Sequence, residues 1–220
     1  MKVLILGAGG IGRATAAALV RRGHEATVAS RTGAPSPDHP TLRVDAVDRS
    51  ALTRAAAGFD VVVNAMNPQS YLHWDRDWPP AASAVLHSVR ATQGRLVTIS
   101  NLYAYGRVDR SMTEESPLLP NGVKGEVRKQ MWLDALAEHN AGTIKATELR
   151  ASDYFGPGVG PKVSFLQNLV LSKVRAGRNI ALPIGDPQAP HTWTYVEDIG
   201  ELAAVLATDD RAWGRAWHVP

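Results

Sequence analysis

The segment KVLILGAGGIGR, residues 2–13, joins a short apolar run to a glycine-rich motif. The Val, Leu and Ile residues of 2–6 predict a buried strand, and Gly7, Gly9 and Gly12 follow in the spacing G-x-G-x-x-G. Between a strand and a helix, this spacing predicts a tight turn at Gly7, an approach of a pyrophosphate to Gly9 and close helix packing at Gly12. Free N–H groups at the helix start hold such phosphates. We therefore expect a dinucleotide on Gly7, Gly9, Gly10, Ile11 and Gly12.

Outward from this motif, short apolar runs alternate with segments of helical period. Strands are predicted at 2–6, 25–30, 41–44, 60–66, 95–100 and 143–149, and helices at 11–23, 49–58, 79–93 and 125–139. This alternation predicts an α/β fold with a doubly wound parallel sheet.

The texture of the sequence changes after about Gly156. Gly- and Pro-rich loops flank a helix predicted at Val163–Arg175, and the sequence ends in a strand-like AWHV. We expect a Rossmann-type dinucleotide-binding domain at 1–155. A small, short C-terminal substrate region is expected at 156–220, interleaved with the last strands of the sheet.

The composition excludes several classes of protein. The 220 residues carry a net charge of +3 that is not gathered into a basic run, so nucleic acid is not indicated. The absence of Cys excludes disulfides and thiolate metal sites, and no metal is expected. Gly7, Arg13 and Arg21 interrupt the first apolar run, so it predicts neither a signal peptide nor a membrane span. We expect a cytoplasmic protein without membrane association.

The end of the second predicted strand bears on the choice of dinucleotide. A site for NAD places Asp or Glu about 20 residues past the glycines, whereas Arg suits the 2'-phosphate of NADP. Ser30 and Arg31 occupy this place with no adjacent carboxylate, so NADP is expected and NAD is left open. Asp45 either accepts from the adenine amino group or caps the turn into the next helix alongside Asp48.

Four segments resemble the NAD(P)-dependent epimerase/dehydratase family, an extended or atypical branch of the short-chain dehydrogenases/reductases. They are ILGAGGIGR, TISNLYAYG, LRASDYFGPGVG and TWTYVEDIGELA, and they are spread over nearly the whole chain. The resemblance implies about seven strands with NAD(P) at their carboxyl edge. It also implies that Asn64, Ala65 and Met66 lie where the family's backbone contacts the ribose and nicotinamide side of the cofactor.

In this family a Ser or Thr and a Tyr-x-x-x-Lys pair perform the proton transfer. The match places Ser100 at the family's first Ser and Asn101 at the second, which is usually the catalytic one. Lys124 stands where Tyr is expected and Arg128 where Lys is expected. The two share one helix face, although an Arg guanidinium stays protonated at ordinary pH, so Arg128 is not expected to transfer protons.

Several nearby residues have weaker claims to a role. Tyr103 is an alternative proton donor, whereas Tyr105 is interpreted as structural. His73 and His191 are expected in loops without metal-ligand spacing. Trp74 and Trp78 are expected to pack rather than to line a pocket. The role of Asp153 is left open, and Asp198 is expected to cap a helix.

The sequence predicts an NAD(P)-binding oxidoreductase or epimerase/dehydratase-like enzyme acting on a small hydroxyl or carbonyl compound. The alternatives are a non-redox isomerase or cyclase of the same fold and a catalytically inactive NADPH-sensing binding protein. The expected partner is a small-molecule substrate, and homodimer formation is left open.

Overall fold

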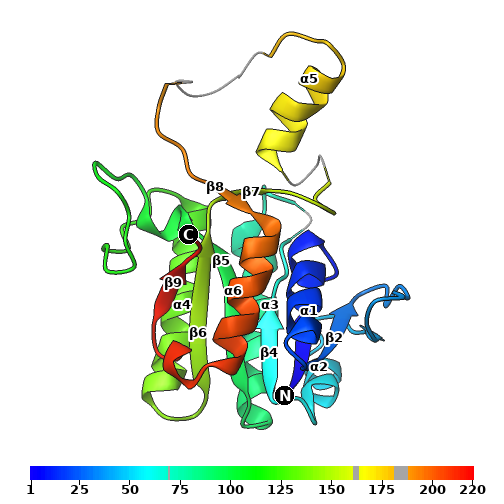
Figure 1. Cartoon of the computed structure of the whole chain (residues 1–220). Coiled ribbons are helices and arrows are strands. Elements are labelled where there is room, and N and C mark those ends of the chain that lie inside the picture. Colours follow the sequence, from blue (N-terminus) through cyan, green and yellow to red (C-terminus); the bar gives the residue numbers. More distant parts are fainter. Residues whose placement is uncertain (69, 161–163, 181–187) are drawn as a thin grey trace.

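The computed structural model describes residues 1–68, 70–160, 164–180 and 188–220. Its main sheet has seven parallel strands in the order β3-β2-β1-β4-β5-β6-β9, and their carboxyl ends point to the top of Figure 1. The strands are β1 (Lys2–Leu6), β2 (Glu25–Ser30), β3 (Thr41–Arg43), β4 (Val61–Asn64), β5 (Arg95–Asn101), β6 (Lys145–Ala151) and β9 (Ala216–His218). The predicted doubly wound parallel sheet is confirmed.

Helices cover both faces of the sheet (Figure 1). On one face α1 (Gly10–Arg21) packs on α6 (Val196–Thr208), and on the other α3 (Trp74–Ala91) packs between α2 (Arg49–Ala56) and α4 (Val123–Asn140). Because the sheet is covered on both sides, its central strands are apolar on both faces, as their Val- and Leu-rich sequences predict. A short helix η3 (Asp210–Ala212) precedes β9.

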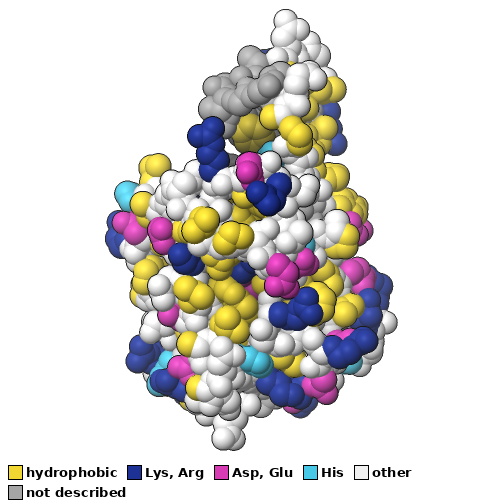
Figure 2. All heavy atoms as spheres, turned by 90° about the vertical axis from the view of Figure 1, so that its left-hand side faces the viewer, with side chains coloured by type: hydrophobic (Ala, Val, Ile, Leu, Met, Phe, Trp, Pro, Cys, Tyr) yellow, Lys and Arg dark blue, Asp and Glu magenta, His cyan; other side chains and the backbone are white. Residues whose placement is uncertain are grey.

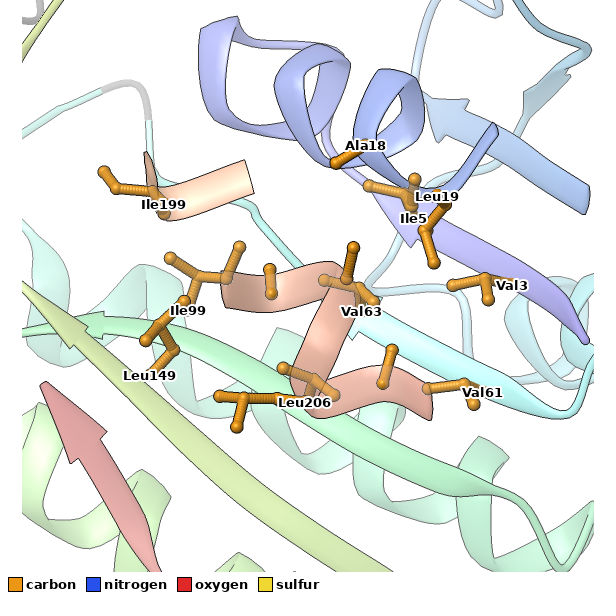
Figure 3. Packing of buried hydrophobic residues seen from close by; sticks show 14 of the residues in the cluster. Val3, Ile5, Ala18, Leu19, Val61, Val63, Ile99, Leu149, Ile199 and Leu206 are labelled. Atoms are coloured by element: carbon orange, nitrogen blue, oxygen red, sulfur yellow. The ribbon is translucent and has the colours of Figure 1, made fainter. Parts of the chain in front are cut away.

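The hydrophobic core is divided by the sheet into two clusters. Val3, Ile5, Val61 and Val63 meet α1 and α6, and Figure 3 shows these side chains beside Leu19 and Leu206. The alternate residues of the same strands, among them Leu4 and Val62, pack in a second cluster with residues of α2, α3 and α4. This alternation fixes the register of the strands, because a shift of one residue would exchange the side chains of the two faces.

Smaller elements lie above the carboxyl edge of the sheet. They are η1 (Leu102–Tyr105), a two-stranded parallel sheet of β7 (Asp153–Phe155) and β8 (Trp193–Tyr195), the π-helix η2 (Leu166–Leu171) and α5 (Ser172–Arg175). The last two form the described part of the helix predicted at Val163–Arg175, whose first residue lies outside the described residues.

Two predictions about helix starts were wrong. α3 begins at Trp74 and not at Pro79, so Pro79 and Pro80 lie inside the helix. The earlier start places both Trp74 and Trp78 on the buried face, and burial of two indoles outweighs the hydrogen bonds that proline cannot donate. Asp198 does not cap α6, because the N-cap residue is Tyr195 and Asp198 lies in the first turn. At that position its carboxylate still interacts favourably with the helix dipole.

The predicted sixth strand is displaced by two residues, because β6 ends at Ala151 rather than at 149. Arg150 is therefore also a strand residue, and it is buried like Glu148, which the predicted strand already contains. A pattern of apolar residues does not predict this extension, since the charge of Arg150 interrupts it.

The surface in Figure 2 carries Lys and Arg side chains interspersed with Asp and Glu rather than one basic patch. Within the described ranges, no helix is long and apolar enough to cross a membrane.

Gly12 allows a direct test of the packing of α1 on β1. A Cβ atom at Gly12 would overlap the carbonyl oxygen of Gly7, whereas one at Gly9 would meet no atom within 4 Å. We expect Gly12→Ala to lower the free energy of unfolding by about 3 kcal/mol and Gly9→Ala by less than about 0.5 kcal/mol. Urea unfolding of both variants measures this difference, and equal stability would contradict the packing.

Candidate functional site

A cleft of about 1600 Å³ lies at the carboxyl edge of the sheet. It contains residues that are far apart in the sequence, because parallel strands end at the same edge. All but two of the predicted site residues line it, namely Gly7, Gly9, Gly10, Ile11, Ser30, Arg31, Asp45, Ala65, Met66, Ser100, Asn101, Tyr103, Lys124 and Arg128. Gly12 and Asn64 are buried beside it.

The glycine loop forms one wall of the cleft. Gly7 has φ +113°, a conformation that favours glycine, and a Cβ there would lie 2.7 Å from the carbonyl oxygen of Ala65. Gly9 is the N-cap of α1 and has no side chain that could bond the first N–H groups. These donors and the open space at Gly9 fit the pyrophosphate of a dinucleotide.

Arg13 was missed by the sequence reasoning, although it closes the motif. Its Nη1 donates to the carbonyl oxygen of Ala8 at 2.6 Å, and its Nη2 donates to that of Gly158 at 3.1 Å. Arg13 therefore ties the glycine loop to the loop after β7, whose Val159 also lines the cleft.

The ends of β2, β3 and β4 form the next part of the wall. Arg31 is exposed and lines the cleft. Asp45 accepts from the backbone N–H of Val47 at 3.2 Å, and Asp48 caps α2 through Ala51 at 2.9 Å. Asp45 thus supports the turn and also faces the cleft, so both of its predicted roles stay open. Asn64 accepts from the N–H of Met66 at 3.3 Å and so shapes the loop from within.

Arg128 lies deep beside the cleft, with only 4% of its surface exposed. Its guanidinium packs on the rings of Trp74, at 5.0 Å, and Trp78, at 4.4 Å. Nη2 donates to Oδ1 of Asn67 at 3.3 Å. Burial lowers the pKa of Arg128 to about 10, against the opposing effect of Glu148. The group therefore remains a cation at neutral pH.

Lys124 lies one turn before Arg128 and is half-buried. Its Nζ is 4.7 Å from the ring centre of Tyr71 and 5.9 Å from that of Trp74. The prediction that Trp74 and Trp78 pack is confirmed, since both are nearly fully buried, but Trp78 also lines the cleft, which was not expected. Their further contact with the cations is a feature that spacing alone did not reveal.

Tyr103, Asn101 and Ser100 follow one another at the end of β5. The Tyr103 side chain lines the cleft, and burial is the main reason that its pKa rises to about 12. Oδ1 of Asn101 accepts from the N–H of Tyr103 at 3.1 Å, which leaves the amide nitrogen as a donor. Ser100 is buried next to Glu148, whose pKa is raised by burial against the effects of Arg150 and the Ser100 hydroxyl.

A buried polar network supports this end of the sheet. Nε of Arg150 donates to Oε2 of Glu148 at 2.7 Å, and Nη1 donates to the hydroxyl of Tyr105 at 2.6 Å. The same hydroxyl lies 2.7 Å from Nε2 of His218 in β9. Tyr105 is therefore a structural residue, as predicted, and it connects η1 to β6 and β9.

Asp153 and His191 both line the cleft, and their side chains are in contact there. Their Oδ2 and Nε2 atoms are 3.0 Å apart. The pairing of β7 with β8 produces this contact, and no local sequence signal announces it. His73 lies in the loop directly before α3, as predicted, and its side chain does not cap the helix. In the described parts of the chain, no group of three or more His, Asp or Glu could hold a metal ion.

The parallel sheet, the glycine loop and the cleft at the carboxyl edge define a dinucleotide-binding protein of the Rossmann type. The model of the NAD dependent epimerase/dehydratase family matches residues 3–219, and the chain belongs to this family. A search of curated proteins finds no match.

Solved structures share the fold over the whole chain. A dTDP-glucose 4,6-dehydratase from Bacillus anthracis, in complex with NAD, is 20% identical with a TM-score of 0.84. The match covers 100% of this chain and 75% of the dehydratase. The UDP-glucose 4-epimerase of Thermus thermophilus, also with NAD, is 22% identical with a TM-score of 0.83. The match covers 100% of this chain and 77% of the epimerase. The Thermotoga maritima UDP-glucose 4-epimerase with UDP-glucose is 18% identical with a TM-score of 0.84. The match covers 100% of this chain and 76% of that epimerase.

The Tyr105 hydroxyl can be removed without changing the shape of the ring. We expect Tyr105→Phe to lower the free energy of unfolding by about 1–3 kcal/mol, because a buried donor of Arg150 loses its acceptor. The matched change Tyr195→Phe should cost less than about 0.5 kcal/mol. Urea unfolding measures both, and equal effects would contradict a supporting role of the network.

Proposed function

We propose that the protein is an NADP-preferring oxidoreductase or epimerase/dehydratase-like enzyme that acts on a small hydroxyl or carbonyl compound. The observation that supports this most is the shared cleft. It contains the glycine loop, Arg31 and the residues at the family's catalytic positions. A bound dinucleotide supplies or accepts the hydride.

The residues of this chain hold the cofactor and move the proton. The first N–H groups of α1 bind the pyrophosphate, and Arg31 binds the 2'-phosphate of NADP. Asn101 donates a hydrogen bond to the substrate carbonyl through its amide. Tyr103 or Lys124 gives the proton to the substrate oxygen, since both line the cleft beside Asn101. Arg128 holds positive charge beside them.

A non-redox isomerase or cyclase is the second candidate. It is favoured by the replacement of the family's Tyr and Lys with Lys124 and Arg128, two cations that could polarise an anionic or enolic substrate. In that case the nucleotide is structural or absent.

Changing Arg31 to Ala tests the preference for NADP. We expect the Kd for NADPH to rise about tenfold or more and that for NADH less than twofold, because only NADPH carries the 2'-phosphate. Calorimetric titration measures both constants. Arg54→Ala is the matched control, since Arg54 is an exposed Arg of α2 outside the cleft. Equal losses for the two dinucleotides would contradict the NADP preference.

Changing Tyr103 to Phe tests the proton donor. With NADPH and a panel of carbonyl compounds, we expect turnover to fall by about 10²–10⁴-fold, with the Kd for NADPH unchanged and Tyr195→Phe as control. Because the pKa of Tyr103 is about 12, the phenol is protonated at neutral pH. Carbonyl reduction should therefore persist to high pH, whereas alcohol oxidation should rise as the pH approaches 12.

If the wild-type protein binds NADPH but turns over none of the carbonyl compounds, this result would count against redox chemistry. Loss of turnover in Lys124→Met but not in Tyr103→Phe would transfer the proton donor role to Lys124.

A further inference from the structure

Two cations of α4 face the cleft side without a carboxylate partner. In the described part of the chain, neither Lys124 nor Arg128 takes part in an ion pair within 4.0 Å. Lys124 also lies in the first turn of the helix, where the dipole disfavours positive charge. Lys124 is therefore stabilised by the rings of Tyr71 and Trp74 rather than by an ion pair.

The buried charges beneath Lys124 are also out of balance. Arg128, Arg150 and Glu148 are each at most 4% exposed. Oε2 of Glu148 is bonded to Nε of Arg150 at 2.7 Å, so this carboxylate is already paired. Arg128 therefore contributes an excess positive charge at the base of the cleft, and a buried charge is costly unless a counter-charge is near.

The surroundings of Arg128 contain donors rather than acceptors. Its Nε and Nη1 and the indole nitrogens of Trp74 and Trp78 are buried without hydrogen-bond partners among the described residues. The only acceptor bonded to the guanidinium there is Oδ1 of Asn67. Because the free nitrogens of Arg128 are shielded, we assign direct ligand contact to Lys124 and a longer-range electrostatic effect to Arg128.

Aromatic rings surround the Lys124 ammonium. The ring centres of Tyr71 and Trp74 are 5.2 Å apart, and those of Trp74 and Tyr103 are 5.9 Å apart. Tyr71 and Tyr103 are each 40% exposed, and both line the cleft. A planar or apolar molecule could therefore stack beside the ammonium.

We infer that the substrate is a small planar molecule with an anionic group, carboxylate or phosphate, bound to Lys124. Its body lies against Tyr71 and Tyr103, which line the cleft, and the buried charge of Arg128 strengthens the attraction. The inference rests on the proposed function and deepens it. It assigns Lys124 to substrate binding and leaves Tyr103 as the proton donor.

The quenching of Trp fluorescence by benzoate, phenyl phosphate and neutral benzamide tests the inference. We expect saturable binding of at least one anion, about tenfold or more tighter than that of benzamide, and the tighter anion identifies the group. Lys124→Met should weaken anion binding about tenfold and leave benzamide unaffected. Lys129→Met is the matched control, since Lys129 lies on the same helix outside the cleft, and should change each Kd less than twofold.

Equal affinities for the anions and benzamide would overturn the inference, as would equal effects of the two Lys variants. The Kd for NADP+ of each variant, from calorimetry, separates the inference from the proposed function. If Lys124→Met weakens NADP+ as much as the anions, the cations serve the dinucleotide; the inference then fails and the proposed function stands. If the wild-type protein binds the anions as expected but no NADP+, the proposed function fails and the anion site stands.

Discussion

The site depends on how closely α1 approaches β1, because this contact sets the position of the helix N-terminus. A side chain at Gly12 would overlap the carbonyl oxygen of Gly7. The other side of α1 is equally tight, since a Cβ at Gly200 of α6 would lie 2.6 Å from the backbone of Ala14. Small residues therefore hold α1 between the sheet and α6. The N–H groups that fit a pyrophosphate belong to a rigid support rather than to a free loop.

A second constraint acts at the other end of the cleft, where β6 buries Glu148 and Arg150. Such a pair costs desolvation energy that its own attraction only partly offsets. The additional bonds from Arg150 to Tyr105 and from Tyr105 to His218 satisfy the remaining donors and fix η1 against β6 and β9. Tyr103 and Tyr105 belong to the same short helix, so this network also positions the proposed proton donor.

The sequence predicted the parts of the fold that depend on local patterns. The glycine spacing and the alternation of apolar runs with helical periods were enough for the parallel sheet and for the location of the dinucleotide loop. The apolar pattern ended β6 two residues early, because the charge of Arg150 obscures the end of a buried strand. It also failed at α3, where Pro79 marked a helix start that the burial of Trp74 moves to an earlier residue.

Contacts between distant segments could not be predicted in the same way. Asp153 and His191 meet only because β7 pairs with β8, and the residues between them give no sign of this pairing. The aromatic rings around Lys124 and Arg128 come from Tyr71 and from the start of α3, far earlier in the chain. Spacing showed that the two cations share a helix face, but not that the face meets two indole rings.

The exchange of Tyr and Lys for Lys124 and Arg128 changes what this helix can contribute to a reaction. The family's pair needs a neutral acid beside a cation, whereas Lys124 and Arg128 are two cations, and Arg128 is buried against two indole rings. Repulsion between like charges favours an anion between or in front of them. Tyr103, on a different element, adds a phenol that is protonated at neutral pH, because burial raises its pKa to about 12. In the proposed function, the binding of charge and the transfer of the proton, which the family combines on one helix, are divided between α4 and η1.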